Sequence, residues 1–320
     1  MVDTCYDKNT YSIQEEIMNV RMLMLAIVVG LALVAAPAFA AYQEISVEQG
    51  GTLQGTVTLH GEVPKPKGYN LVSFPDPVYC GRISNGQGWR LLQPFQVGPK
   101  GEFQNVVIYF KRVEKGKPFK FTPPLIEAKD CRFEPYITVV RDPGNVKVVN
   151  MDPVMHDIQA YETSKHGARV LFNDPLPMSP KLRKQDLMAG KTVKNRAGKI
   201  MIEKVKMRRG RNIFAMQCGF HPYMESWGVA VKNPYYALTD EQGKFVIDEI
   251  PPGTYQVVAW HPMLTKEFTV TIEPNQTTTL DIEFEAPKGR LYVNEAQEQT
   301  RFGMELLGGS KIVPTVELQK

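Results

Sequence analysis

The sequence predicts an all-β protein with two β-sandwiches. Proline and glycine are frequent, with 24 Pro and 25 Gly scattered without period through 320 residues, and both residue types interrupt helices and form turns. Short segments of alternating apolar and polar residues recur between these turn residues, as expected for strands with one buried face. Helical periodicity is not sustained in the core of the sequence, and one helix is expected in the tail, around residues 294–307.

The predicted strands follow one another from residue 51 to residue 284. The sequence Asp142-Pro143-Gly144-Asn145 separates two of them and is typical of a tight turn. Strands this short, at this spacing, indicate sandwiches. The expected strands are 51–59, 105–112, 137–140, 146–150, 213–217, 227–232, 244–247, 254–260, 267–272 and 278–284.

The composition excludes several classes of protein. With 15 Phe, 13 Tyr and 3 Trp, the chain has too many large aromatic side chains to remain disordered. Its 320 residues are enough for two domains of ordinary size, each with its own core. An apolar run of the ~18–20 residues that span a membrane is absent from the sequence, except near the N-terminus.

The first 40 residues have the features of a signal peptide. Arg21 precedes the apolar stretch 22–36, and Ala38 and Ala40 supply the small residues of a cleavage site. We therefore expect residues 1–40 to be removed and the mature chain to be periplasmic or otherwise exported, without a transmembrane span. The alternative is an uncleaved membrane anchor, for which the run is short. Acidic residues before Met18 are unusual in a signal peptide and indicate a start codon assigned too early.

Removal of residues 1–40 also removes Cys5 and leaves an odd number of cysteines for an oxidising compartment: Cys80, Cys131 and Cys218. Cys218 opens the loop Cys218-Gly219-Phe220-His221-Pro222-Tyr223-Met224 between two predicted strands. A thiolate, an imidazole and a thioether together suit copper that cycles between Cu(I) and Cu(II). Zinc prefers four nitrogen, thiolate or carboxylate ligands and has no use for the methionine.

Such a site needs a second imidazole, and His156 is the candidate. It lies upstream, after the strand predicted over 146–150 and its turn. The alternative is structural, because an isolated buried cysteine usually packs as a small hydrophobe and an isolated histidine as a hydrogen-bonded polar residue. Structural or surface roles are expected for the other histidines, and packing in the core for the two methionines that flank His156: His60, His166, His261, Met151 and Met155.

The segment that ends at His156 resembles the first-histidine strand of cupredoxins, the small blue copper proteins. It contains Phe133 and Pro135, a hydrophobic strand, a glycine turn at Gly144 and the pattern Asn-x-Asp-x-x-x-His. The downstream pattern Cys-x-x-His-Pro-aromatic-Met is similar to the short ligand loop of amicyanin, a member of that family. The resemblance covers roughly residues 125–233 and implies a Greek-key domain with one type 1 copper ion. The implied ligands are His156, Cys218, His221 and Met224.

Two positions depart from the cupredoxin pattern. Cupredoxins usually have Asn directly after the first histidine ligand, where the amide helps to hold the ligand loop, and this chain has Asp157. The amicyanin loop has Pro directly before the second histidine, where this chain has Phe220. A carboxylate beside the site would favour Cu(II) electrostatically and lower the reduction potential.

Residues on both sides of the cupredoxin-like segment resemble the carboxypeptidase regulatory-like domain, a transthyretin-like β-sandwich. The resemblance rests on 55–57, 238–245 and 250–255. It implies a scaffold or docking platform without catalysis, and therefore a cupredoxin-like domain inserted into a sandwich. The expected segments are a signal peptide at 1–40, the first part of the sandwich at 46–113, the copper domain at 125–233, the second part of the sandwich at 234–287 and a tail at 288–320.

If Cys218 binds copper, Cys80 and Cys131 remain, and we expect them to form a disulfide in the oxidising compartment. This bond would join the sandwich to the start of the copper domain. The loop that it closes, of about fifty residues, is worth roughly 4 kcal/mol in the chain-entropy model. The alternatives are two separate buried thiols, or a bond that involves Cys218 and destroys the metal site.

The segment 181–211 is strongly basic, with twelve Lys or Arg residues against two Asp or Glu. One interpretation is a solvated surface loop. The other is a docking surface for an anionic membrane or for an acidic redox protein, such as a c-type cytochrome or a periplasmic dehydrogenase. Nucleic acid is not expected as a partner of an exported protein.

These residues favour one-electron transfer by an exported copper protein. The alternatives are a copper-binding or copper-delivery protein without redox partners, and a structural β-sandwich module with a vestigial metal site. An enzyme is not expected, because the sequence shows no paired carboxylates, no Ser–His arrangement and no second metal cluster. A ligand set of two histidines, a cysteine and a methionine also leaves no open position for a substrate.

Overall fold

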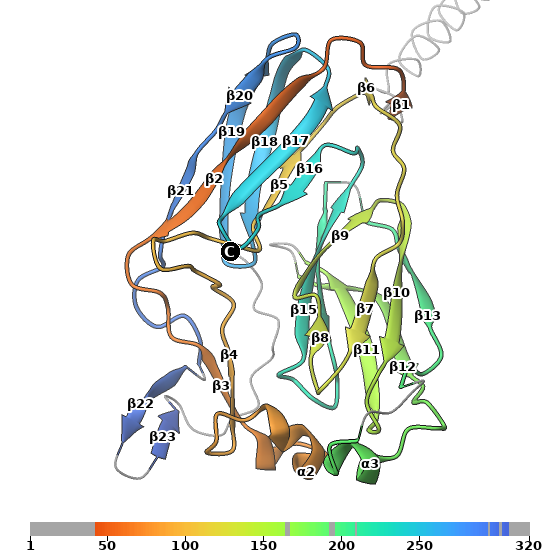
Figure 1. Cartoon of the computed structure of the whole chain (residues 1–320), viewed down its shortest axis with the longest axis vertical. Coiled ribbons are helices and arrows are strands. Elements are labelled where there is room, and N and C mark those ends of the chain that lie inside the picture. The colour runs from red at the N-terminus through yellow and green to blue at the C-terminus, as the bar shows by residue number, and fades with distance from the viewer. Residues whose placement is uncertain are drawn as a thin grey trace, which may run out of the picture. The chain divides into compact units, whose positions relative to one another are not determined.

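The computed structural model describes residues 42–163, 167–191, 196–208, 210–293, 295–300 and 303–306. The predicted signal peptide, His166 and two of the basic residues, Lys194 and Arg209, lie outside these ranges. Within them the all-β prediction is confirmed, and the helices are segments of only three to five residues (Figure 1). No helix in the described ranges is long and apolar enough to cross a membrane.

One pair of sheets encloses the first hydrophobic core. A four-stranded sheet has the order β13-β10-β7-β8, and a five-stranded sheet has the order β12-β11-β14-β15-β9. Alternate side chains such as Val148, Ile158 and Phe214 point into this core and are fully buried. The strands are β7 (Leu125–Ala128), β8 (Phe133–Glu134), β9 (Ile137–Arg141), β10 (Gly144–Asn150), β11 (His156–Glu162), β12 (Arg169–Leu176), β13 (Met201–Val205), β14 (Ile213–Gln217) and β15 (Glu225–Val231).

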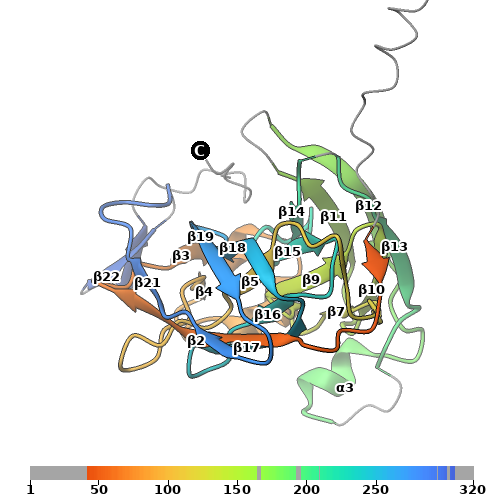
Figure 2. The same cartoon turned by 90° about the horizontal axis from the view of Figure 1, so that it is seen from above.

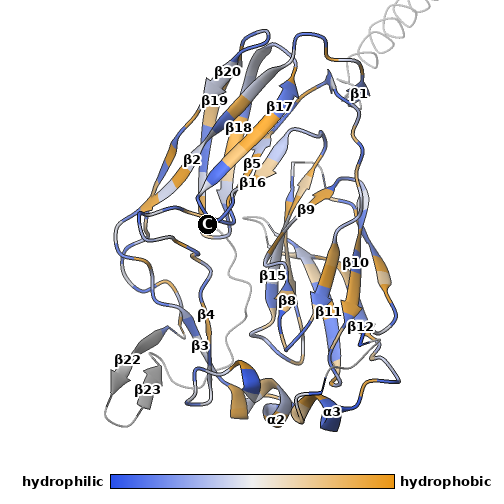
Figure 3. Ribbon diagram, in the orientation of Figure 1, coloured by the Kyte–Doolittle hydropathy of each residue, from blue (hydrophilic) through white to orange (hydrophobic). Residues whose placement is uncertain are grey.

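A second pair of sheets encloses another core. One sheet has the order β16-β5-β18-β19, and the other has the order β17-β2-β20, with β21 also paired to β2. Figure 3 shows apolar residues along β17, where Phe245 and Ile247 are buried beside Leu53 of β2 and Val246 between them is exposed. The strands are β2 (Gly51–His60), β5 (Val107–Phe110), β16 (Tyr236–Leu238), β17 (Lys244–Ile250), β18 (Gly253–His261), β19 (Leu264–Ile272), β20 (Thr277–Thr279) and β21 (Ile282–Glu285).

A third cluster of buried residues joins the two sandwiches. It combines Val258 and Trp260 of the second sandwich with Trp227 and Val229 of the first. β5 and β15 are consequently buried along their whole lengths, because each has a core on one face and the junction on the other. Burial on both faces explains the absence of charged residues from β5 and from residues 227–231 of β15.

Short elements flank the sheets, and α3 lies outside the strands (Figure 2). β1 pairs in parallel with β6, and β3 pairs with β4 in a hairpin whose connection contains the segments η1, α2 and η2. These elements are β1 (Gln43–Glu44), β3 (Lys67–Asn70), η1 (Leu71–Ser73), α2 (Pro77–Cys80), η2 (Gly81–Ile83), β4 (Trp89–Leu92), β6 (Lys115–Gly116) and α3 (Lys184–Met188).

The connection between β3 and β4 packs on the first core, although it lies upstream of that sandwich in the sequence. Leu71, Tyr79, Cys80 and Ile83 are buried members of the first core cluster. We call residues 71–83 the covering segment.

The helix expected around 294–307 is wrong. The described residues of this tail form two antiparallel strands, β22 (Ala296–Thr300) and β23 (Gly303–Leu306). Glycine at position 303 disfavours a helix through this part of the chain, because glycine costs about 1 kcal/mol relative to alanine inside a helix.

Glu162, at the end of β11, has no exposed side-chain surface, and its carboxylate accepts hydrogen bonds from three residues. Its carboxylate accepts hydrogen bonds from Arg169 Nη2 at 2.6 Å, Arg211 Nη1 at 2.6 Å and the Arg208 backbone N–H at 2.8 Å. Burial raises the pKa of this carboxyl, but the hydrogen bonds outweigh burial and lower the pKa to about 2. Part of the basic segment is thus held within the fold.

We predict that Glu162→Gln lowers the free energy of unfolding by about 2–4 kcal/mol at pH 7, because two arginines lose their carboxylate. Since the pKa of the folded-state carboxyl is depressed, its contribution is complete above the unfolded-state pKa of about 4.3 and is lost as the pH falls toward 2. Denaturant titrations should therefore show a large gap between variant and wild type at pH 7 and a small gap at pH 2. The exposed control Glu241→Gln should change little. An equal gap at both pH values would contradict this assignment.

Candidate metal centre

Three of the expected ligand atoms converge in the first core. His156 Nδ1 lies 3.2 Å from His221 Nδ1, and Cys218 Sγ lies 3.9 Å and 3.6 Å from these two atoms respectively. The three residues are at most 1% exposed. An ion in the plane of these three atoms and equally far from each would lie about 2.1 Å from them. This distance falls within the ~2.0–2.3 Å lengths of histidine and thiolate bonds to a metal such as zinc.

Strand pairing brings these residues together. His156 is the first residue of β11, and Cys218 follows the last residue of β14, its antiparallel neighbour. The loop from Cys218 to β15 is closed by two backbone hydrogen bonds, from Met224 N–H to His221 O at 2.8 Å and from Cys218 N–H to Met224 O at 3.1 Å. Met224 is fully buried and belongs to the same core cluster as Cys218.

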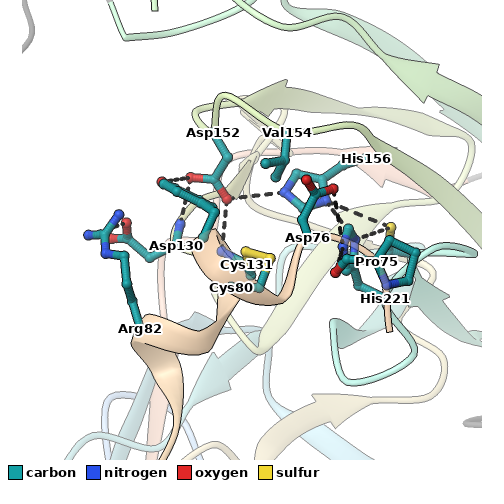
Figure 4. The surroundings of a disulfide bond; sticks show 12 residues. Pro75, Asp76, Cys80, Arg82, Asp130, Cys131, Asp152, Val154, His156 and His221 are labelled. Atoms are coloured by element: carbon teal, nitrogen blue, oxygen red, sulfur yellow. Dashed lines mark hydrogen bonds and ion pairs between the residues drawn. A yellow bond between two sulfur atoms is a disulfide. The ribbon is translucent and has the colours of Figure 1, made fainter. Parts of the chain in front are cut away.

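The far nitrogen of each imidazole is hydrogen-bonded to an oxygen that can only accept. His156 Nε2 lies 3.1 Å from Asp152 Oδ2, and His221 Nε2 lies 3.2 Å from the carbonyl oxygen of Pro75 (Figure 4). In a neutral imidazole with this partner the hydrogen lies on Nε2, and Nδ1 then offers a lone pair. Two imidazole nitrogens that face one another at 3.2 Å, with a cysteine sulfur beside both, are donor atoms of the kind that bind a metal ion. The donor set therefore fits a bound metal ion.

Burial controls the charge of these groups. It lowers the pKa of His221 to about 4, and the neighbouring His156 acts in the same direction, so His221 is neutral at physiological pH. Burial also raises the pKa of the Cys218 thiol to about 12. Because thiolate is the form that binds metal, a metal ion would have to displace this proton.

Asp152 holds the outer side of His156. The carboxylate has no exposed surface, and both oxygens are fully used. Burial raises its pKa, but the bond from His156 and the backbone donors outweigh burial and lower it. Five donors bond to it at 2.8–3.1 Å: His156 Nε2, Cys131 N–H, Asp130 N–H, Tyr79 O–H and Arg196 Nη2.

Two of these donors come from the turn between β7 and β8. Asp130 and Cys131 have φ values of 50° and 53°, and Lys129 and Arg132 exchange backbone hydrogen bonds across them. Such turns favour Asn-Gly, since most residues resist positive φ. Here the Asp152 carboxylate accepts both backbone N–H groups of the turn and stabilises it.

A disulfide joins this turn to the covering segment. Cys80 and Cys131 are bonded, with their Cα atoms 5.6 Å apart, and both are buried. Figure 4 shows the disulfide beside Asp152, which bonds both Cys131 N–H and His156 Nε2. The two cysteines that are not candidate metal ligands, Cys80 and Cys131, therefore connect the covering segment to the first core. The third cysteine of the described residues, Cys218, has a free thiol.

The covering segment contacts the partners of both histidines. Pro75 accepts from His221, the Asp76 carboxylate lies 4.0 Å from His221 Nε2, and Tyr79 donates to Asp152. Sequence reasoning did not predict Pro75, Tyr79 or Asp152 as parts of the site. The available signals were the tyrosine next to Cys80 and the acidic residue within the Asn-x-Asp-x-x-x-His pattern.

Asp157 holds the ligand loop in the way that the resemblance implies for asparagine. Its Oδ1 accepts from Gly219 N–H at 2.6 Å, and its Oδ2 accepts from Gln159 Nε2 at 2.8 Å. A Cβ atom at position 219 would lie 2.3 Å from that Gln159 nitrogen, so a larger residue there would displace the Gln159 side chain. The departure at position 157 thus keeps the hydrogen bond and adds a negative charge.

The two other histidines of the described residues, His60 and His261, lie away from this centre, as expected. His60 is near the surface, 3.9 Å from Glu283, and the buried His261 bonds the Pro94 carbonyl oxygen at 3.1 Å in the second sandwich. Of the two methionines expected in the core, Met151 is half-buried, and the expectation for Met155 is wrong because its side chain is 49% exposed. Met155 lies on the loop that turns into β11, where its neighbours Val154 and His156 point inward.

The basic segment is only partly a free cationic surface. Five of its described bases lie within ion-pair distance of acids: Arg183 and Lys191 with Asp186, Lys184 with Asp76, Arg196 with Asp130 and Asp152, and Arg211 with Glu162. The remaining described bases are exposed: Lys181, Lys199, Lys204, Lys206 and Arg208. The segment therefore contributes to the fold and also leaves exposed positive charge.

Comparison with protein families gives one match. A model of the carboxypeptidase regulatory-like domain matches residues 228–285. This range contains β16 to β21 of the second sandwich and begins inside β15 of the first. The resemblance stated for this part of the chain is thereby confirmed. No curated protein matched the sequence.

Solved structures with some likeness include copper proteins. A purple cupredoxin from Nitrosopumilus maritimus aligns over 34% of this chain and 99% of its own, with 17% identity and a TM-score of 0.23. A copper-containing nitrite reductase from Thermus scotoductus SA-01 aligns over 38% of this chain and 25% of its own, with 16% identity and a TM-score of 0.22. These scores are too low to support an argument, and the site is therefore interpreted from its own residues.

We predict that Asp152→Asn weakens metal binding roughly 10–100-fold, because an amide cannot accept five hydrogen bonds and leaves His156 poorly oriented. Competition with a chelator of known affinity measures the loss. Asp186→Asn is the matched control, since it removes an ion-paired carboxylate outside the site and should leave metal affinity unchanged. Unchanged affinity in a folded Asp152 variant would show that this carboxylate has only a structural role.

Proposed function

We propose that this chain is an exported type 1 copper protein that carries single electrons between redox partners. The observation that carries the proposal is the convergence of two imidazole lone pairs and one cysteine sulfur within 3.2–3.9 Å in a buried core. Copper bound by His156, Cys218 and His221, with Met224 as the weak fourth ligand, would supply one-electron chemistry.

The donor set favours copper over zinc. A structural zinc site takes four strong ligands, and the described residues bring together only three such groups here. The second group of candidate ligands, formed by Cys131, Asp152 and His156, is not a separate site, because Cys131 is in the disulfide and His156 belongs to the first group.

The surroundings support electron transfer over copper delivery. All three ligands are at most 1% exposed, and hydrogen bonds to Asp152, Pro75 and Asp157 hold the histidines and the ligand loop in place. An electron can leave such a site without any movement of the ligands, whereas an ion would have to break these contacts. A fixed ligand geometry also limits reorganisation between the two oxidation states. We propose no catalytic activity, because the four ligands would leave no position for a substrate.

The proposed partner is an acidic redox protein such as a c-type cytochrome or a periplasmic dehydrogenase. Five exposed bases of the segment 181–211 support this choice, since exposed charge steers the encounter of redox partners. Export of the chain rests on the signal-like residues 1–40.

We predict that Cu(II) added to the mature protein gives an intense blue or green charge-transfer band, and that Cys218→Ser abolishes it because the band requires thiolate-bound copper. Absorption spectroscopy measures the band, and circular dichroism checks that the variant folds. Phe220→Ala is the matched control, since Phe220 lies in the same loop but is 44% exposed. Reversible voltammetry would then support a carrier. A band of equal intensity in Cys218→Ser would contradict the ligand assignment.

We predict that the rate of electron exchange with an acidic c-type cytochrome falls as ionic strength rises, because exposed charges are screened over about 8–10 Å at physiological salt. Changing Lys199, Lys204 and Lys206 together to Glu should slow the low-salt rate by at least tenfold. Stopped-flow absorption measures both effects. The control changes three exposed lysines of the second sandwich, Lys65, Lys100 and Lys244, to Glu. If both triple variants slow the reaction equally, only net charge matters and the segment is not a docking surface.

A further inference from the structure

A second polar pocket lies beside the ligand loop and is not part of the metal centre. It has a volume of about 340 Å³, near the lower end of the ~300–1,000 Å³ range of small-molecule sites. Three separate parts of the chain line it: Arg90 in β4, Arg132 in the turn before β8, and Tyr223 in the ligand loop. The pocket therefore forms only when these three segments fold together.

Each of these three residues brings a buried hydrogen-bonding atom without a partner. Arg90 Nε, Arg132 Nε and the Tyr223 hydroxyl have no acceptor or donor among the described residues. A guanidinium nitrogen can only donate, so the two arginines require acceptors. A buried donor left without an acceptor costs about 1–3 kcal/mol, which makes three such atoms in one pocket an unusual concentration.

The charge of the pocket points to an anionic occupant. The two arginines are close enough for Arg132 to disfavour the charge of Arg90, in addition to the effect of burial, which lowers the pKa of Arg90. Glu225, which also lines the pocket, is already paired with the buried Lys67 at 3.1 Å and accepts from Tyr136 at 3.3 Å. The other acid of the pocket, Glu134, is exposed; its charge favours that of Arg90 and so offsets part of the effect of burial and of Arg132.

We propose that this pocket binds a small dianionic oxyanion, of the phosphate, sulfate or dicarboxylate class, between Arg90 and Arg132 with the Tyr223 hydroxyl as a further donor. Guanidinium groups bind such oxygens through paired, charge-assisted hydrogen bonds. Two arginines match two negative charges. The occupant would supply acceptors for the three atoms that the protein leaves without partners.

The pocket also touches the metal-binding loop. Tyr223 directly precedes Met224, and its ring centroid lies 5.6 Å from that of His221. A bound oxyanion would thus contact the loop through Tyr223. The binding itself does not depend on copper, so the test uses the metal-free protein and stays separate from the proposed electron transfer.

The experiment is a calorimetric titration of the metal-free mature protein with inorganic phosphate, sulfate and malonate at constant ionic strength, with chloride as the background salt. We expect saturable binding of one dianion per chain. Arg90→Gln and Arg132→Gln should each weaken it at least tenfold, and Tyr223→Phe should weaken it several-fold while the aromatic packing stays. Arg112→Gln is the matched control, since that arginine pairs with Glu114 outside the pocket and should not affect binding.

Three results would overturn the proposal. The first is that none of the three probes shows saturable binding at concentrations up to about 10 mM. This would mean that Glu134 or water accepts the hydrogen bonds of the two arginines. The second is binding that survives in both arginine variants. The third is equal weakening by Arg112→Gln, which would indicate general charge attraction only. If the arginine variants fail to fold, full-strength binding in Tyr223→Phe, for which the structure predicts a loss, also counts against the pocket.

Discussion

The Asp152 carboxylate is the group on which the geometry of the metal centre depends. It has no exposed surface, and it accepts from a ligand imidazole, two backbone N–H groups, a tyrosine hydroxyl and an arginine. A buried carboxylate is costly unless its oxygens are bonded, and this one is bonded at every position. The same five bonds that make its burial tolerable also orient His156, stabilise the β7–β8 turn and anchor the covering segment.

The centre is consequently assembled from parts of the chain that are far apart in sequence. His156 comes from β11, Cys218 and His221 come from the loop after β14, and Pro75 and Tyr79 come from the covering segment. The Cys80–Cys131 disulfide spans 51 residues and connects the covering segment to the turn bonded by Asp152. Closing a loop of this size stabilises the fold mainly by restricting the unfolded chain. The covering segment therefore orients His221 directly, through the Pro75 carbonyl oxygen, and supports His156 through the bond from Tyr79 to Asp152.

Much of this fold could be predicted from local sequence. Alternating patterns located β2, β14 and β18 to within about two residues, because these strands each bury one face or are bounded by clear turn residues. The strands β7, β11, β12 and β13 of the first sandwich were not predicted; in β11 and β12 the polar residues His156 and Asp157 and the pair Asp174-Pro175 make the alternation hard to recognise. The strands of the tail were taken for a helix, because short apolar segments do not distinguish the two periods.

The candidate ligands could also be predicted, since spacing and donor chemistry mark them without a structure. The residues that orient them could not. Pro75 acts through its backbone carbonyl, which no side-chain pattern reveals, and Tyr79 and Arg196 act through a carboxylate in another strand connection. Likewise the charge of the segment 181–211 was evident, but its internal pairing with Glu162, Asp130 and Asp152 depends on tertiary contacts.

The most direct test of the central claim is X-ray absorption spectroscopy of the copper-loaded mature protein at the copper K-edge. The claim is that one ion lies among His156 Nδ1, His221 Nδ1 and Cys218 Sγ. It predicts a first shell with two nitrogen scatterers at about 2.0 Å and one sulfur scatterer at about 2.2–2.3 Å, with imidazole carbon scattering beyond them. A first shell that contains only nitrogen and oxygen would place the ion elsewhere and contradict the claim.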